Sequence, residues 1–294
     1  MGDYLIKGVD KDLKLRVFFA KTTQTVEAAR KIHNTSATAT AAFGRVLTIG
    51  AIMGSGFKND NDLLTLKISG DGPIGNILVV ANNKGRVKGI VDNPNADLPS
   101  TDEGKLDVGS LVGKTGTVTA IMDLGLKEPY VGQTSLVTGE IGDDIANFYL
   151  QSEQIPTAVG LGVLVEKDLS VKAAGGFIIQ TLPDILDEDI TKIEESLAKA
   201  KPLSTLIDDG YSPEEIMKEI LSDFEMEITD KLELEYYCDC SREKVEKILI
   251  SLGEKEITDI IEEDGKSEVK CHFCNTDYHF SREELEKILL TIKD

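Results

Sequence analysis

Four cysteines near the C-terminus constrain the fold of this chain more than any other feature. Cys238 and Cys240 form one close pair, Cys271 and Cys274 form the other, and thirty residues separate the two pairs. Such an arrangement is typical of a tetrahedral zinc site with four thiolate ligands, because each pair supplies one edge of the tetrahedron. The second pair has the usual spacing of two residues, whereas the first has one intervening residue and is a tighter variant.

Three interpretations of these thiols follow from their spacing. Unconnected core thiols are disfavoured, because free cysteines seldom cluster as two pairs with polar neighbours. A purely structural zinc site is the second interpretation. The third, which we favour, is a zinc site that also senses oxidants, since metal-bound thiolates can be oxidised or pair with one another once the metal is lost. A bond between Cys238 and Cys240 would need a local bend, because extended chain places their Cα atoms roughly 6.6 Å apart.

The charge of the chain is strongly negative and unevenly distributed. The formal net charge is −20. Residues 184–235 carry 17 acidic and 5 basic residues, so this stretch has a net charge of 5 − 17 = −12. Such a chain should repel phosphate backbones, and we therefore expect no nucleic-acid partner.

The N-terminal sequence has no apolar core typical of a signal peptide. No run of residues approaches the roughly 20 apolar residues of a membrane span, so no membrane partner is expected. The cysteines are therefore expected to serve metal or redox chemistry rather than an extracellular disulfide framework, and the expected compartment is the cytoplasm.

Residues 1–181 predict one α+β domain with a mainly antiparallel sheet. Alternating or apolar runs bounded by turn residues predict strands, and apolar residues at helical spacing predict helices. Residues 1–20 predict strands, most clearly at 13–20, and further strands are predicted at residues 62–69, 76–81, 86–91, 115–122, 130–137, 157–166 and 171–180. The predicted helices are residues 22–33, 36–54 and 141–151.

Two features of this domain are candidates for a catalytic or cofactor site. Residues 70–75 match G-x-G-x-x-G, but Pro73 and a strand-like segment follow where a dinucleotide site needs a helix, so we predict a hairpin connection. His33 is the one histidine before residue 272, and a lone helical histidine is typical of a surface or internally bonded residue. The domain therefore supports no enzymatic function.

Residues 182–230 predict an acidic helical linker, with helices over 187–200 and 212–224. Ser212 is the expected N-cap of the second helix, and Pro213 takes its first position. The apolar stripe of this helix consists of Ile216, Met217, Ile220, Leu221 and Phe224. Such a helix depends on docking its stripe onto another surface, most simply the first domain. Two interpretations stay open, a plain connector and a segment that detaches to expose apolar surface.

Residues 231–294 predict a small zinc-binding module. Each cysteine pair is followed by a similar helix, one starting at Ser241 and the other at Ser281. A module this small has little core, so a structural metal that supplies an apparent ~10–16 kcal/mol is expected to fold it. His272 and His279 are possible substitute ligands, although four sulfurs already fill a tetrahedron.

Several motifs together make the chain resemble a known family. They are Tyr237-Cys-Asp-Cys-Ser-Arg-Glu, Cys271-His-Phe-Cys-Asn, Tyr278-His-Phe, Ala174-Gly-Gly-Phe-Ile-Ile-Gln-Thr-Leu-Pro, Gly70-Asp-Gly-Pro-Ile-Gly and Lys88-Gly-Ile-Val-Asp-Asn-Pro. Over residues 3–290 the chain is similar to the heat-shock protein 33 family of cytoplasmic, redox-regulated holdase chaperones that act in stress without ATP. The resemblance implies an α+β N-terminal domain, a helical linker wrapped on it, and a C-terminal Cys₄ zinc module.

The resemblance also implies a switch. Cys238, Cys240, Cys271 and Cys274 would bind one Zn²⁺ in a reduced, inactive state. Oxidants would then form the disulfides Cys238–Cys240 and Cys271–Cys274, zinc would leave, and the module and linker would unfold. The oxidised form would bind unfolding client proteins, usually as a homodimer.

Two alternative functions remain to be weighed against this switch. A thiol–disulfide oxidoreductase would use the Cys-x-x-Cys motif at 271–274, but the βαβ context expected before such a motif is missing. A constitutive binding module with inert structural zinc would release no metal on oxidation.

Overall fold

The computed structural model describes residues 2–293, and the chain divides into two compact units, Met1–Tyr237 and Cys238–Asp294. The predicted α+β class with mainly antiparallel sheets is confirmed. Each unit is described by itself below.

The first sheet of the N-terminal unit has five antiparallel strands in the order β10-β1-β2-β9-β8. Its strands are β1 (Tyr4–Asp10), β2 (Leu15–Lys21), β8 (Thr157–Val165), β9 (Val171–Thr181) and β10 (Met226–Glu233). Side chains on the inner strands are apolar on both sides of the sheet. In β2, for example, Phe18 lies in one buried cluster and Phe19 in another. Both faces of this sheet must therefore be covered.

The second sheet has six strands in the order β11-β5-β4-β3-β6-β7. Its strands are β3 (Leu63–Gly70), β4 (Asn76–Asn82), β5 (Arg86–Val91), β6 (Gly116–Asp123), β7 (Tyr130–Ser135) and the short β11 (Glu235–Tyr236). All neighbours pair antiparallel except β11, which pairs parallel with β5. Residues 70–75 connect β3 to β4 as a hairpin, which confirms that prediction.

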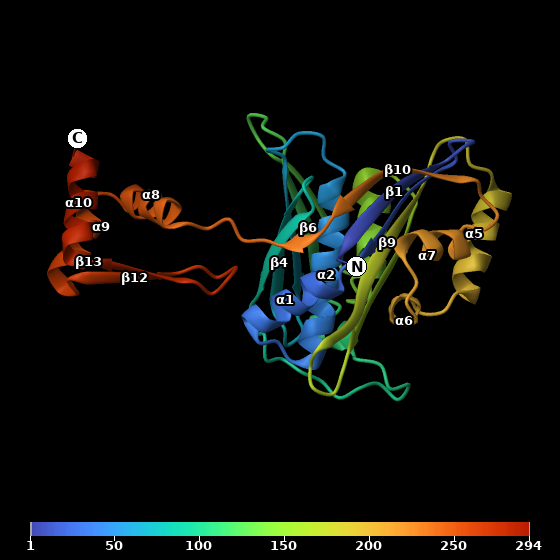
Figure 1. The fold of residues 1–294 in the computed structure, drawn as a ribbon, viewed down its shortest axis with the longest axis horizontal. Helices are drawn as coiled ribbons and strands as arrows, with labels where there is room; N and C mark the ends of the chain where they lie inside the picture. The colour runs from blue at the N-terminus through green and yellow to red at the C-terminus, as the bar shows by residue number, and fades with distance from the viewer. Residues whose placement is uncertain (1, 294) are drawn as a thin grey trace. The chain divides into compact units, whose positions relative to one another are not determined.

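A long helix, α2 (Ala37–Ser55), lies between the two sheets (Figure 1). Ser36 caps it by accepting a hydrogen bond from the backbone N–H of Ala39. By length and composition α2 could cross a membrane, which the sequence analysis did not anticipate, but 89% of its most apolar window is buried inside the fold. It is therefore the core helix of this unit. The further helical segments of this part are α1 (Thr23–His33), α3 (Val108–Val112), α4 (Gly142–Phe148) and the π-helical turn η1 (Tyr149–Glu153).

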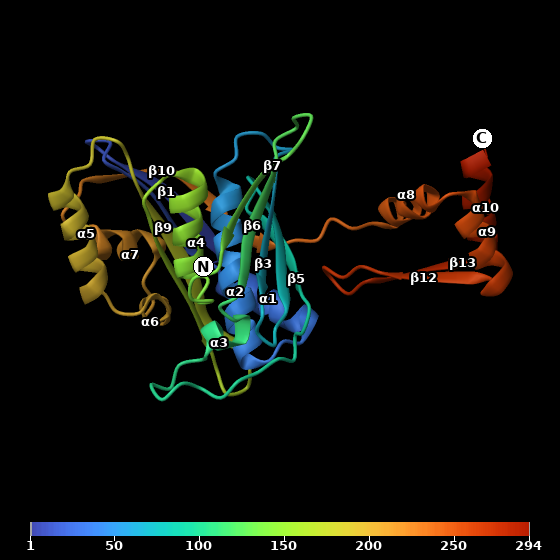
Figure 2. The ribbon, with the colours of Figure 1, turned by 180° about the vertical axis from the view of Figure 1, so that it is seen from behind.

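Three short helices cover the other face of the five-stranded sheet, as both views of the ribbon show (Figures 1 and 2). They are α5 (Asp187–Lys199), α6 (Leu203–Asp208) and α7 (Pro213–Ile220). The Ser212 cap and Pro213 stand where they were predicted. The helix ends at Ile220 rather than at 224, because Leu221 leaves helical geometry at φ −113° and ψ 38°. The apolar stripe nevertheless docks, since Ile216, Met217, Ile220 and Leu221 are all buried against the sheet.

A segment that the sequence analysis missed joins the edges of both sheets. We name residues 226–237 the strap. Its first part is β10, paired with β1, and its second part is β11, paired with β5. Leu234, between them, is buried in the main core. The hydroxyl of Tyr236 forms a hydrogen bond with His33 Nε2 at 3.1 Å. His33 is therefore internally bonded, which is one of the two alternatives that the sequence predicted.

The C-terminal unit contains α8 (Arg242–Leu252), α9 (Glu254–Glu263), the hairpin β12 (Lys266–Lys270) and β13 (Asp277–Ser281), and α10 (Arg282–Lys293). The two helices predicted after the cysteine pairs are α8 and α10, whereas α9 and the hairpin were not predicted. Its buried core consists of Val245, Leu249, Ile257, Ile261, Phe280, Leu285 and Ile288. A core of this size gives little stability by itself.

Candidate metal centre and redox site

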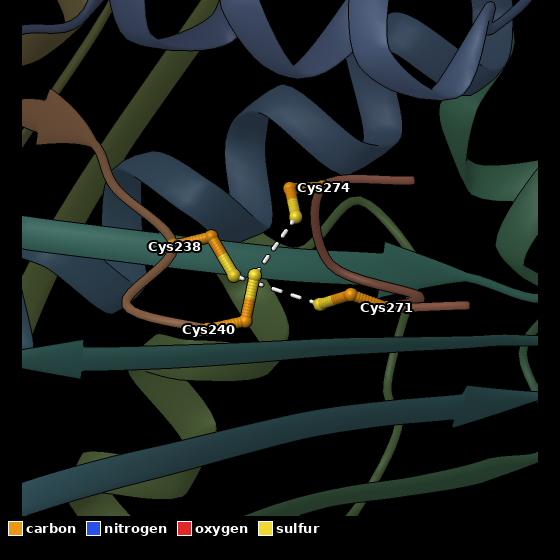
Figure 3. Close-up of side chains that lie close together, drawn as sticks. All are labelled: Cys238, Cys240, Cys271 and Cys274. Atoms are coloured by element: carbon orange, nitrogen blue, oxygen red, sulfur yellow. Dashed lines mark hydrogen bonds between the residues drawn. The ribbon is translucent and has the colours of Figure 1, made fainter. Parts of the chain in front are cut away.

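The four cysteines converge in the C-terminal unit from two separate segments. Cys238 and Cys240 lie on the chain just before α8, and Cys271 and Cys274 lie in the turn that joins β12 to β13. The four sulfur atoms lie within 4.8 Å of one another, and all four side chains are half-buried free thiols (Figure 3). The predicted site residues are thus brought together by the fold.

The local chain geometry explains why the second pair converges. Asn275 has a left-handed φ of 57°, which turns the chain back after Cys274. The N–H of Asn275 donates to the carbonyl of Cys271 at 2.7 Å, and the N–H of Cys271 donates to the carbonyl of Thr276 at 2.9 Å. This tight turn directs both sulfurs to the same side.

The spacing of the sulfurs fits a tetrahedral metal. Zinc–sulfur bonds of about 2.3 Å place the sulfurs of a regular tetrahedron about 3.8 Å apart. Cys238 Sγ lies 3.7 Å from Cys271 Sγ, and Cys240 Sγ lies 3.3 Å from Cys274 Sγ. Both short distances join one segment to the other (Figure 3). A metal at the centre would therefore tie the two segments together.

Neighbouring side chains contact the sulfurs directly, which sequence reasoning did not predict. The hydroxyl of Tyr278 donates to Cys240 Sγ at 3.1 Å, and the hydroxyl of Thr276 lies 3.2 Å from Cys274 Sγ. Groups that surround metal ligands in this way orient them and adjust their basicity. Their position immediately after the second cysteine pair is the one signal in the sequence that could have drawn attention to them.

The thiols differ in how readily they ionise. Burial raises the pKa of Cys238 and of Cys240. Burial also opposes ionisation of Cys274, but hydrogen bonds with Thr276 outweigh it and lower the pKa of Cys274 to about 7. The bond to Cys240 raises the pKa of Tyr278 to about 12, so its hydroxyl keeps its proton at neutral pH. Metal binding would release protons from the cluster, because the ligands must be thiolates.

The histidines considered as substitute ligands lie outside this cluster. Among the described residues, the group that could hold a metal consists of the four cysteines. The side chain of His279 is 71% exposed and lies 3.6 Å from Glu268. Neither His279 nor His272 is needed to complete four-fold coordination.

Comparison with known proteins assigns this chain to a protein family. The sequence profile described as "Hsp33 protein" matches residues 3–281. This chain belongs to the Hsp33 family. Relatives named 33 kDa chaperonin match over 98% of the chain. That of Alkaliphilus oremlandii is 47% identical, with 96% of its length covered, and that of Geobacillus kaustophilus is 46% identical, with 98% covered.

A solved structure agrees with the family assignment. The crystal structure of the 33 kDa chaperonin (heat shock protein 33 homolog) of Thermotoga maritima superimposes with a TM-score of 0.90, at 36% identity and with all of both chains covered. The resemblance inferred from the motifs is thereby confirmed, and the chain is a member of a family whose relatives are named chaperonins.

Proposed function

We propose that this Hsp33-family chain is a redox-regulated, ATP-independent holdase of the cytoplasm. In the reduced state, Cys238, Cys240, Cys271 and Cys274 hold one Zn²⁺ and the protein is inactive. Oxidation forms the disulfides Cys238–Cys240 and Cys271–Cys274, and zinc is released. Each pair of thiolates loses two electrons as its disulfide forms, and two molecules of hydrogen peroxide accept these four electrons and, with four protons, become four molecules of water.

The arrangement of the sulfurs supports this proposal. In the metal-binding arrangement, the short sulfur distances run between the segment at 238–240 and the turn at 271–274. Disulfides formed within each segment would remove every sulfur link between the segments. Since the module's own core is small, loss of a metal worth an apparent ~10–16 kcal/mol should unfold it.

The packing of the linker supports the second half of the switch. We assign residues 1–181 to the core domain, 182–230 to the linker and 231–294 to the redox module. Two hollows of about 350 Å³ and 240 Å³ open between the linker helices and the five-stranded sheet, and Leu197 lines both. Side chains that line such a hollow lack packing partners on one side, so the layer is held less firmly here than a close-packed core.

Release of the linker would expose apolar surface for clients. The sheet face beneath it includes Tyr4, Ile6, Val17, Phe19 and Phe177. Exposed contiguous apolar surface of this kind binds partially unfolded proteins. We infer that the oxidised form binds such clients as a homodimer. The net charge of −20 repels phosphate backbones, so we infer that nucleic acid is not a partner.

The deciding experiment measures three quantities on one sample. Zinc content, free thiols and suppression of the thermal aggregation of an unrelated protein are followed before and after mild peroxide treatment. We expect one zinc and four thiols without activity before treatment, and no zinc, no free thiols and full activity afterwards. Equal activity in both states would reject the switch, and steady turnover with a dithiol would favour an oxidoreductase instead.

A further inference from the structure

Strand β10 is an edge strand that pairs with β1 along its length but buries little of its side chains. Six of its eight residues are exposed, and only Met226 and Leu232 are half-buried. A register shift opposite Lys7 and Gly8 interrupts its ladder with β1. The ion pairs that help to hold it, Lys7–Asp230 and Lys231–Glu214, lie at the surface and contribute little each.

Both ends of β10 lead into segments that the proposed switch releases. The linker helices precede it in the chain, and the compact C-terminal unit with the four cysteines begins shortly after it, at Cys238. Among its side chains, Lys231 stacks on the Tyr4 ring at 3.8 Å and pairs with Glu214 of α7 at 3.0 Å. Release of α7 removes that support, so β10 should leave together with the linker.

Departure of β10 would leave β1 with unpaired backbone groups along one edge. β1 runs antiparallel beside β10 along its whole length (Figure 1). Free strand edges pair readily with other extended chains. Beside this edge, Tyr4 and Ile6 face the side that the linker uncovers, while Leu5 faces the permanent core.

The residues of β10 match the uncovered side poorly. Glu233 stands opposite Tyr4, and Lys231 stands opposite Ile6, so two charged residues flank an apolar face. On the other side of the strand, Leu232 matches Leu5 and Asp230 pairs with Lys7. An uncharged strand with apolar residues at all three positions would bury more surface here than β10 does.

We propose that an extended, uncharged segment of an unfolding client adds to β1 as an antiparallel strand in the place of β10. This inference rests on the proposed function and specifies how its clients are held. Unfolding proteins expose short β-prone segments of low charge, which are the segments that otherwise aggregate. Backbone pairing with β1 gives affinity for many client sequences. Contact of client side chains with the apolar face formed by Tyr4 and Ile6 then favours uncharged segments over charged ones.

The first test uses fluorescent peptides on the full-length, oxidised protein. The probe is a short peptide of alternating valine and threonine with a solubilising tail. Two matched peptides carry N-methyl groups on either all the valines or all the threonines. Neighbouring N–H groups of a strand point to opposite edges, so only one of the two methylated peptides loses the N–H groups that would donate to β1. We expect this peptide to bind at least about tenfold more weakly than the other. Equal affinities would mean unspecific apolar adhesion and would reject strand addition.

The second test follows hydrogen exchange of the β1 amides. For the β1 amides that face β10, we expect slow exchange in the reduced protein, fast exchange after oxidation, and slow exchange again when client or probe peptide is bound, while the β1 amides that face β2 stay slow throughout. Edge strand β7 serves as the internal control and should not change. Protection of β1 in oxidised protein that grows with its concentration alone would assign the edge to a second copy of this chain and reject the client.

The outcomes separate this inference from the function on which it rests. If oxidation releases no zinc and suppresses no aggregation, the proposed function fails. If oxidised protein suppresses aggregation while the β1 amides on the edge left by β10 still exchange fast in the client complex, the chaperone function stands and strand addition is rejected.

Discussion

The two faces of the five-stranded sheet are covered in different ways. On the inner face, α2 buries 17 of its 19 residues between the two sheets. On the outer face, α5 buries only Asp189 and Ile193 of its 13 residues. The same sheet therefore carries a long, almost fully buried helix on one side, and on the other a cover that is anchored mainly by α6 and α7.

Alanine and glycine let α2 approach its neighbours closely: a Cβ added at Gly54 would lie 2.9 Å from the Cβ of Ala81. On the outer face, α6 also lies close to the sheet, since a Cβ added at Gly162 would lie 2.8 Å from the backbone N of Ser204. Beside Leu197 of α5, however, two hollows remain between the helices and the sheet. Close packing resists local opening, whereas a loosely packed layer opens at low cost. The following predictions test whether the two faces respond independently.

Removal of the metal should produce the largest difference in stability between the outer cover and the inner core. Cys271→Ser deletes one of four ligands, so most of the apparent ~10–16 kcal/mol of zinc binding should no longer stabilise the module. Limited proteolysis should then cut the chain beyond residue 181 and leave the core intact. The matched control is His279→Ala, which should keep both zinc and protease resistance. Protease sensitivity throughout residues 1–181 would show that the faces are not independent.

Truncation on the inner face should weaken the whole N-terminal unit. Phe43 of α2 is 1% exposed, and Phe43→Ala should cost about 3–5 kcal/mol of unfolding free energy. Urea unfolding followed by circular dichroism should show a lower midpoint in both redox states. A variant that keeps the wild-type midpoint but gains activity when reduced would reverse the roles assigned to the two faces.

Truncation on the outer face should loosen the cover alone. Ile216 of α7 is 2% exposed, and Ile216→Ala should cost about 2–5 kcal/mol of docking free energy. We expect partial suppression of aggregation by the reduced, zinc-loaded variant, with the unfolding midpoint of the core unchanged. Ile248→Ala is a suitable control, because Ile248 is 58% exposed. No gain of activity would indicate that docking of α7 does not limit the switch.

Loss of one hydrogen bond at the metal site should change how readily the cover is released. Tyr278→Phe removes the donor to Cys240 Sγ, a bond worth about 1 kcal/mol. Zinc affinity, measured by competition with a chelator, should fall by roughly fivefold to tenfold, and peroxide should release zinc faster. The control variant Tyr130→Phe, in edge strand β7 of the six-stranded sheet, should leave both measurements unchanged.

Acid should loosen the outer face slightly. Burial alone would raise the pKa of Glu214, but hydrogen bonds from Tyr4 and Lys231 lower it below its usual value of 4.5. A lowered pKa means that this group stabilises docking above about pH 4.5 and loses that contribution as the pH falls through the lowered value. Glu214→Gln should remove this dependence, an effect of roughly 0–1 kcal/mol after solvent screening. Hydrogen exchange of α7 between pH 5 and pH 3 measures it.

The sequence predicted those elements that can be recognised from a short stretch of residues. Apolar runs bounded by turn residues predicted β3 to β6, and the spacing of the cysteines predicted the metal site. β10 was missed because its sequence, MEITDKLE, is charged and its partner β1 lies at the other end of the chain. The roles of Tyr278 and Thr276 were missed because a hydrogen bond to sulfur depends on the turn at Asn275, which no pattern predicts.

The strap joins the rims of both sheets, because β10 pairs with one and β11 with the other while Leu234 lies buried between them. At Gly85, the carbonyl of Glu233 passes so close that an added Cβ would lie 1.9 Å from it. Loss of the strap would therefore soften the sandwich along this rim as well as uncover one face. The N-terminal unit should therefore be more flexible in the oxidised protein than in the reduced one, so that its surface could adjust to clients of different shape.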